Sequence, residues 1–359
     1  MAKKRAMSGN SSKEETDTAL VFAAFHGNAR KVVELLSQGA RVDARDEDGI
    51  TPLLAAAYFD HTDVCELLLE KGKADIEETT SIGSTALMLG AIKNNADTLA
   101  LLLSKGARVD ARDAIDDTPL LAAASHGHTD VCKMLLEKGK ADIEETEPEG
   151  NTALKLAAGQ GHVSTVAMLL SKGARVEIRN NEGYTPFLEA VENGHIEVCK
   201  LLLETGKVNV KDTGANGATP LLTAAQEGHT EVCELLLANG SDLEESDPTT
   251  LSTALHNAAT FGYQSLLQLL LSHKPDVNTR DRTGFTPLSV ASHEGHLASV
   301  VTLLTAGADP MLPEKDGFLP IHQAARENHH EVVRLLIEQG RCRPDQVRLA
   351  ALQSFGHLH

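Results

Sequence analysis

Hydrophobic and polar positions repeat along this chain every 33 or 34 residues. In the copy at 51–84, Thr51 and a proline precede an apolar run at 53–57, and a second apolar set follows with three- and four-residue spacing at 64–68. Thr-Pro is typical of a helix start. The threonine hydroxyl can cap the helix, and proline has no backbone N–H, which costs nothing in the first turn because that N–H would have no partner within the helix. The later spacing predicts a second helix with one apolar face, and we expect Gly72 to end it in the left-handed conformation.

Each copy is therefore predicted to form a helix, a tight turn, a second helix and a projecting loop. The ten predicted starts are Thr18, Thr51, Thr85, Thr118, Thr152, Thr185, Thr219, Thr253, Thr286 and, in degenerate form, Leu319. A unit this short cannot enclose its own core, so neighbouring units must stack and bury one another. We expect an all-α solenoid with a disordered tail at 1–16, ten repeats at 17–341 and a capping helix at 342–359.

Three motifs recur in register in these copies. The first motif, Thr-Pro-Leu, opens units at Thr51, Thr118, Thr219 and Thr286. The second, Gly-His, lies between the two predicted helices at Gly127, Gly161, Gly194, Gly228 and Gly295. The third begins with glycine after the second helix, at 106–110 and 307–309. In these motifs the chain resembles the ankyrin repeat over about residues 17–341. The resemblance implies a rigid scaffold for protein–protein interaction. One departure is the histidine three residues after the threonine, which survives only at His256 and His322, so the local hydrogen bonding of the family is expected to be weaker elsewhere.

A second period of 67 residues makes the projecting loops alternate in charge. One kind of loop carries arginine pairs, and the other carries carboxylates at Asp75, Glu77 and Glu78 or at Asp142, Glu144 and Glu145. The arginine pairs are Arg41 with Arg45, Arg108 with Arg112, and Arg175 with Arg179. Two interpretations stay open: neighbouring loops support each other, or the loops form a charge-striped surface for an extended partner.

The net charge of −18 argues against a duplex-DNA groove or an anionic membrane as the main partner. A basic protein partner fits that charge, although solubility explains it equally well. No apolar stretch reaches the roughly 18 residues of a membrane span. Cys65, Cys132, Cys199 and Cys233 recur at equivalent positions of the second helix and are expected to be buried thiols. We therefore predict a cytoplasmic protein, while the basic cluster at 3–5 leaves open a nuclear address or a solvated tail.

Nothing in the sequence predicts catalysis, a metal site or a cofactor. Seven histidines occupy the turn between the two helices, where the resemblance implies a structural role: His61, His128, His162, His195, His229, His296 and His329. The sequence has no phosphate loop, nucleophile elbow or Cys-x-x-Cys pair. The turn at 46–49 lacks the alternating ligands of a calcium loop.

The eleven aromatic residues are the best candidates for partner contacts. The resemblance implies that partners touch the loop tips and the seventh and eighth residues after the threonine. Phe25, Tyr58, Phe59 and Phe261 fall on first helices, and Tyr184, Phe285 and Phe318 fall at loop bases. The alternative for Phe285 and Phe318 is packing against the next loop. We expect one aromatic anchor near the N-terminal end and a second in the last three units.

The predicted function is that of a monomeric scaffold that binds a protein or peptide along a concave groove. The alternative is an adaptor that selects a substrate with its repeats and recruits a ubiquitin ligase or similar machine through a terminal segment. The resemblance also makes Asn209 and Asn278, at comparable loop positions, candidates for modification by an oxygenase.

Overall fold

The computed structural model describes residues 2–339, with side chains from residue 13 onward. Within this range the regular elements are helices, joined by loops that form isolated β-bridges such as Thr79 with Thr85. The chain divides into two compact units, residues 1–181 and 182–359. The predicted capping helix at 342–359 lies outside the described residues.

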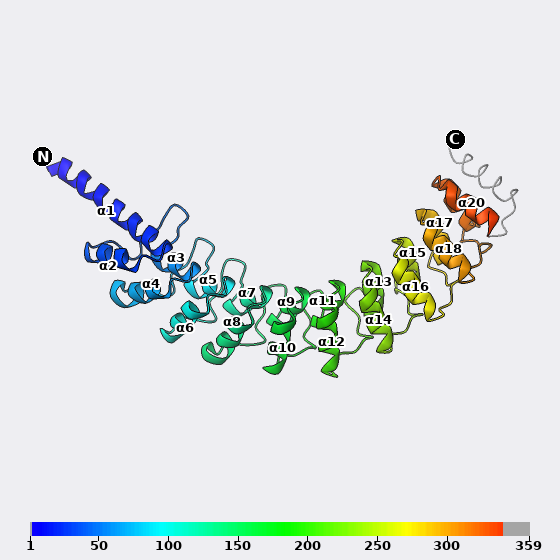
Figure 1. The fold of residues 1–359 in the computed structure, drawn as a ribbon, viewed down its shortest axis with the longest axis horizontal. Helices are drawn as coiled ribbons and strands as arrows, with labels where there is room; N and C mark the ends of the chain where they lie inside the picture. The colour runs from blue at the N-terminus through cyan, green and yellow to red at the C-terminus, as the bar shows by residue number, and fades with distance from the viewer. Residues whose placement is uncertain (1, 340–359) are drawn as a thin grey trace. The chain divides into compact units, whose positions relative to one another are not determined.

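Unit 1 contains five pairs of helices, drawn from blue to green in Figure 1. They are α1 Ala2–Phe25 with α2 Ala29–Ser37, α3 Pro52–Tyr58 with α4 Thr62–Leu67, α5 Ala86–Ile92 with α6 Ala96–Ser104, α7 Pro119–Ser125 with α8 Thr129–Met134, and α9 Ala153–Gly159 with α10 Val163–Ser171. Two π-helical turns follow α4 and α8, η1 Leu68–Gly72 and η2 Leu135–Gly139. First helices pack on first helices, and second helices pack on second helices.

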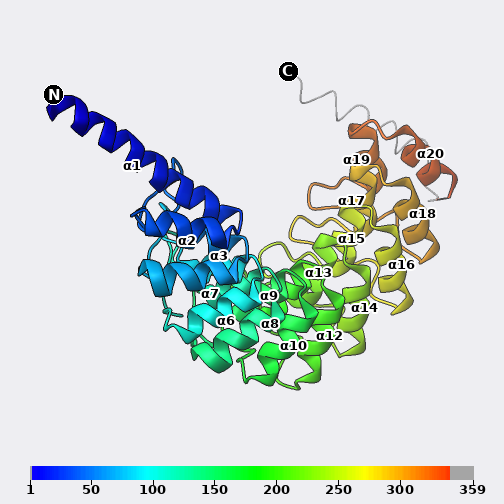
Figure 2. The same ribbon diagram turned by 60° about the vertical axis from the view of Figure 1, so that its left-hand side comes forward.

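Unit 2 contains five further pairs arranged in the same two layers, seen well in Figure 2. They are α11 Pro186–Glu192 with α12 Ile196–Glu204, α13 Pro220–Glu227 with α14 Thr230–Ala238, α15 Ala254–Thr260 with α16 Gln264–Ser272, α17 Pro287–Glu294 with α18 Leu297–Thr305, and α19 Pro320–Arg326 with α20 His330–Glu338.

First helices after α1 begin directly after the predicted start residues. The Thr51 hydroxyl, for example, accepts the N–H of Leu54 at 3.4 Å, which satisfies a donor of the first turn. At Leu319, which has no hydroxyl, His322 accepts the backbone N–H through Nδ1 at 2.9 Å. His256 does the same for the N–H of Thr253, at 3.2 Å. The two surviving histidines of the motif therefore make the local hydrogen bonds that the resemblance implies.

The core of each unit is a stack of small and branched side chains. Ala56, Ala57 and Leu53 of α3 are fully buried, as are Val64 and Leu68 on the second helix of the same pair. Alanine brings neighbouring first helices close together, while leucine fills the space between the two layers. Single repeats have no core of this kind, so the burial comes from the neighbouring pairs.

The cysteine prediction is confirmed for the four described thiols, which are all buried and free. Burial raises the pKa of Cys65 and of its three counterparts to about 12. A thiol this hard to ionise is a poor nucleophile and a poor metal ligand, so these residues serve packing.

The structure differs from the sequence prediction at the start of the chain. Helix α1 runs from Ala2 to Phe25, so residues 2–16 are helical and Thr18 lies inside the helix. The reason is local: no proline follows Thr18, and the stretch 13–17 contains no helix breaker. The Asp17 carboxylate of this stretch accepts the backbone N–H of Arg41 at 2.7 Å, which ties α1 to the first loop.

The prediction for Gly72 is also wrong. Lys73, with φ of 60°, adopts the left-handed conformation, and the N–H of Ala74 donates to the carbonyl of Leu68 at 3.0 Å. In the next repeat the equivalent hydrogen bond joins the N–H of Ala107 to the carbonyl of Leu102, so its two ends are one residue closer in the sequence. The extra residue of this 34-residue copy is therefore absorbed by a wider last turn, η1, and the copy one super-period later repeats this in η2.

Candidate protein-binding surface

The turn histidines join each repeat to the one before it. In unit 1, His128 Nε2 lies 2.9 Å from the carbonyl oxygen of Ile92, and His162 Nε2 lies 3.0 Å from that of Ser125. Each ring also rests on the glycine of the preceding turn: a Cβ added at Gly127 would lie 2.7 Å from the ring of His162. These side chains therefore hold the stack together, which is the structural role that was predicted for them.

The tips of the first four projecting loops share one geometry. We call the turns at 46–50, 80–84, 113–117 and 147–151 fingertips 1 to 4. In each, the N–H of the first residue donates to the carbonyl of the last, with distances of 3.0–3.4 Å. Fingertips 2 and 3 touch through a 2.8 Å hydrogen bond from Ala114 N–H to the Ile82 carbonyl. The side chains at these tips are thus carried on a regular backbone.

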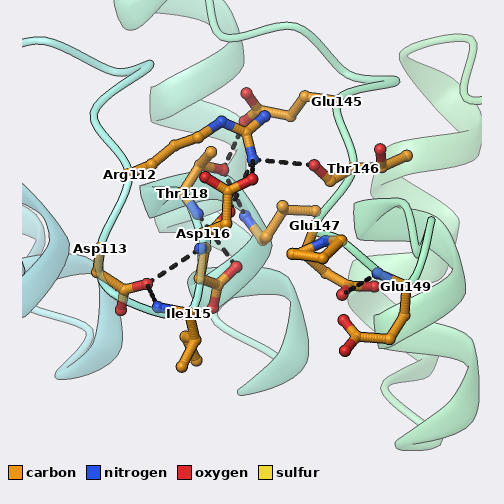
Figure 3. Close-up of polar contacts among 12 residues, drawn as sticks. Arg112, Asp113, Ile115, Asp116, Thr118, Glu145, Thr146, Glu147 and Glu149 are labelled. Atoms are coloured by element: carbon orange, nitrogen blue, oxygen red, sulfur yellow. Dashed lines mark hydrogen bonds and ion pairs between the residues drawn. The ribbon is translucent and has the colours of Figure 1, made fainter.

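Several of the loop charges support a neighbouring loop. The Glu77 carboxylate accepts the backbone N–H of Arg108 at 2.8 Å, and Glu144 does the same for Arg175. Figure 3 shows the Arg112 guanidinium reaching the carbonyl of Thr146 in the next loop, at 3.0 Å. The first arginine of each pair forms an ion pair within its own loop, as Arg108 does with Asp110 at 3.1 Å. The charge-striped surface for a partner stays a prediction.

Three of the four fingertips are acidic. Fingertips 1, 3 and 4 contain three, three and two carboxylic residues and neither lysine nor arginine. On fingertip 3, Asp113 Oδ1 accepts the N–H groups of Ile115 and Asp117, both at 3.0 Å. Partial burial, together with repulsion from Asp113 and Glu147, raises the pKa of Asp117 to about 6. One carboxyl of this group is thus poised near neutral pH.

The raised pKa of Asp117 gives the stability of unit 1 a specific pH dependence. The folded state binds the proton more tightly than the unfolded chain, whose ordinary value is 3.8, so the ionised carboxylate destabilises the fold. The penalty is absent below about pH 4 and complete above about pH 6. Asp117→Asn is therefore expected to stabilise the protein by about 1 kcal/mol at pH 7 and by nothing at pH 4. Urea unfolding at both values checks this.

The matched control for this variant is Glu149→Gln, which removes one negative charge from the neighbouring exposed fingertip. It should change the unfolding free energy by less than about 0.5 kcal/mol at either pH. Equal gains for both variants at pH 7 would mean that net charge, and not the burial of Asp117, sets the effect.

Aromatic side chains gather beside fingertip 1. Phe25 at the end of α1 and Phe59 at the end of α3 have ring centroids 4.2 Å apart, and Tyr58 meets Phe59 edge-on at 4.9 Å. Phe25 is 44% exposed and Phe59 is 41% exposed. They border an open hollow of about 250 Å³, which we call the aromatic hollow; its lining is Phe25, Ile50, Leu54, Ala55, Tyr58, Phe59 and Leu89, with Asp46 and Asp48 from fingertip 1.

The structure thus brings three of the seven predicted aromatic residues together. It also shows members of the cluster that sequence reasoning missed. Phe22 is 63% exposed, and its ring lies 4.2 Å from that of His26, which in turn lies 5.0 Å from Phe25. The four-residue spacing between Phe22 in α1 and His26 directly after it was the available signal. Ile82 and Ile115, exposed on fingertips 2 and 3, were likewise missed.

The four aromatic residues predicted in unit 2 lie apart from one another in separate local contacts. Phe261 is 49% exposed, stacks on Tyr263 at 5.5 Å and borders a smaller, more polar hollow with Leu222 and Gln226. Phe285 and Phe318 are half-buried and meet histidines of their own first helices edge-on, His293 at 6.2 Å and His322 at 6.0 Å. Packing against the next loop, the alternative considered for these two residues, stays a prediction.

Tyr184 has a different environment. Its ring lies against Gly214, and partial burial together with nearby glutamates, Glu192 first among them, raises its pKa. The two asparagines considered for modification are both at loop turns. Asn209 is exposed, and its side chain accepts the N–H of Lys211 at 3.0 Å; Asn278 is half-buried and accepts that of Asp309 at 2.9 Å. Their modification stays a prediction.

Between residues 2 and 339 no helix combines the length and the apolar character needed to cross a membrane. Over the same residues no group of three or more histidine, cysteine, aspartate or glutamate side chains is arranged to hold a metal ion.

The stacked helix pairs, joined from one repeat to the next by the turn histidines, define a repeat protein. The model of three ankyrin repeats matches residues 20–113, 112–180, 173–247 and 244–314, and the single-repeat model matches 316–348. The chain therefore belongs to the ankyrin repeat family, and its fold is the all-α ankyrin-repeat solenoid. Ankyrin repeats serve generally as protein–protein interaction domains and are typically non-catalytic.

Known proteins resemble the chain in part of their length. It is 33% identical over 192 residues to the ankyrin repeat and KH domain-containing protein mask-1 of Caenorhabditis elegans, which is 53% of this chain and 6% of that protein. It is 32% identical over 190 residues to the human transient receptor potential cation channel subfamily A member 1, 53% of this chain and 15% of that protein. The chain thus spans less than a fifth of these relatives.

A solved structure agrees with the fold. The crystal structure of the human ASB11 ankyrin repeat domain superposes with a TM-score of 0.55 at 26% identity, and the match covers 61% of this chain and 97% of that domain.

Proposed function

We propose that this chain binds a segment of a partner protein on the surface of unit 1 formed by the aromatic hollow and the fingertips beside it. The observation that carries the proposal is the cluster of Phe25, Tyr58 and Phe59 around an apolar hollow, in which the rings of Phe25 and Phe59 remain exposed and Tyr58 is half-buried. Exposed aromatic side chains gathered around a hollow are typical of the residues that dominate binding energy in protein interfaces.

The scaffold supports this function because it holds the binding side chains in place before the partner arrives. Phe59 follows a short helix in which residues 52–57 are buried, and His61 fixes its repeat to the previous one through the Phe25 carbonyl at 3.0 Å. Side chains that are already ordered lose little entropy on binding. The adaptor alternative depends on a terminal segment and gains no support from the described residues.

Site-specific crosslinking tests the proposal. The photoreactive residue p-benzoylphenylalanine is placed at Phe59 and, as a matched control, at Glu66, an exposed residue on the second helix of the same repeat. Irradiation in extract of the source cells should yield a crosslinked partner protein from position 59 and not from position 66. The same crosslinks from both positions, or crosslinks from position 66 alone, would contradict the proposal. Circular dichroism confirms that both variants are folded.

A further inference from the structure

We infer that the segment bound at the aromatic hollow carries one large aliphatic or aromatic side chain with lysine or arginine within a few residues of it. This inference rests on the proposed function and adds to it the chemistry of the partner. It follows from three features of unit 1: the shape of the hollow, a cation already seated on its wall, and the carboxylates on its rim.

The hollow fits a single large apolar side chain. Its volume of about 250 Å³ is small for a drug-sized ligand but ample for one leucine, methionine or phenylalanine side chain. Leu54 and Leu89 line it from two successive first helices, and the rings of Phe25 and Phe59 flank it. An apolar anchor placed there would cover aromatic surface that now faces water, which is the main gain in such contacts.

A cation already occupies part of this wall. The Lys93 ammonium lies 4.5 Å from the centroid of the Tyr58 ring, within the range of a cation–π interaction. Lys93 comes from the next repeat and is exposed, so its side chain can move aside. The face of Tyr58 therefore accepts a positive group in the free protein, and a lysine or arginine of the partner can take the same place.

The rim favours the same charge. Asp46 and Asp48 border the hollow; the Asp46 carboxylate accepts the N–H of Asp48 at 3.0 Å and of Ile50 at 2.8 Å, while Asp48 is exposed on the outer side of the turn. Fingertip 2 has no carboxylate, but Asp113 and Glu149 add negative charge on fingertips 3 and 4, where Asp116 is paired with Arg112 at 3.2 Å. An acidic segment would be repelled along this path, whereas a basic one is attracted and steered to the hollow.

Selection from a peptide library tests the inference on the full chain. Random twelve-residue peptides displayed on phage are enriched on the wild-type protein, and the enriched sequences are synthesised with a fluorescent label. Their dissociation constants are then measured for wild type, Asp48→Lys, Glu66→Lys and Tyr58→Ala/Phe59→Ala. Asp48→Lys and Glu66→Lys change the net charge equally, but only the first alters the rim of the hollow.

We expect the enriched peptides to combine a large apolar residue with at least two nearby basic residues. Asp48→Lys should weaken their binding about tenfold, and Glu66→Lys less than twofold. Peptides without excess lysine or arginine, or equal effects of the two lysine variants, would overturn the inference. In that case, loss of binding in the aromatic double variant would still support the proposed function. No enrichment, or binding that is indifferent to the double variant, would contradict both.

Discussion

Gly127→Ala is expected to lower the free energy of unfolding of unit 1 by about 3 kcal/mol. Gly127 has φ of 73°, which costs an alanine about 1 kcal/mol or more in backbone strain. The new Cβ would also lie 2.7 Å from the His162 ring, so the ring must move and its bond to the Ser125 carbonyl is lost. That loss adds about 1–2 kcal/mol, because the Ser125 carbonyl between the two repeats is left without its hydrogen-bond partner.

Gly106→Ala separates the two contributions. Gly106 has φ of 88°, but a Cβ there meets nothing within 4 Å, so only the backbone strain of about 1 kcal/mol remains. Urea unfolding reports the total effect, and hydrogen exchange of α7 to α10 reports it locally, since long repeat arrays need not unfold in one step. Equal losses for the two glycine variants would show that the contact with His162 contributes nothing.

The double variant Gly127→Ala/His162→Ala completes the test. Removing the ring takes away the clash together with the bond, so the two substitutions should be less than additive by at least about 1 kcal/mol. If the effects of the two substitutions on the free energy of unfolding add fully, the strain caused by Gly127→Ala does not come from the His162 ring.

Tyr58→Ala/Phe59→Ala is expected to weaken the binding of a peptide that occupies the aromatic hollow about 100-fold. The substitutions remove two of the three rings that border the hollow, together with the seat of the Lys93 ammonium. A central aromatic residue of an interface can cost about 2 kcal/mol when truncated, but two rings in contact are not additive, so we expect about 2.7 kcal/mol for the pair, which corresponds to 100-fold. Titration of the labelled peptide by fluorescence anisotropy measures the change.

Phe261→Ala is the matched control for this double variant. Phe261 stands at the same position of its repeat as Phe59, and its exposure of 49% is close to the 41% of Phe59. It should leave the affinity of a twelve-residue peptide bound in unit 1 within twofold. Both variants should melt within a few degrees of wild type, since the removed rings lie partly in solvent. A double variant that binds as tightly as wild type would remove the aromatic hollow from the function.

Features that depend on neighbouring residues in the chain were predictable. The helix starts at the threonines follow from a hydroxyl that caps its own first turn, as Thr118 does for the N–H of Leu121 at 3.3 Å. The burial of Cys65 and its counterparts follows from helical spacing, and the turn histidines follow from the family motif. The wider turn at η1 was missed because the extra residue could be placed at several points of the loop, and only the hydrogen bond from Ala74 to Leu68 locates it.

The candidate site was predicted in part. Position in the repeat placed Phe25, Tyr58 and Phe59 on one surface, but it placed Phe285 and Phe318 there too, and these pack on histidines of their own repeats. Phe22 stands four residues after Thr18, a position that is buried in the second repeat as Ala55. Its exposure depends on what covers α1 from outside, and no residue pattern reports that.

The sequence alone therefore determined the period, the class of fold and the residues that face inward, because caps, turns and helical spacing act over a few residues. The tertiary structure decided which exposed side chains form a site: the Phe25–Phe59 contact joins residues one repeat apart, and the pKa of Asp117 depends on carboxylates of two loops. These properties arise from the register in which repeats stack, and stacking brings together groups that the chain separates by more than 30 residues.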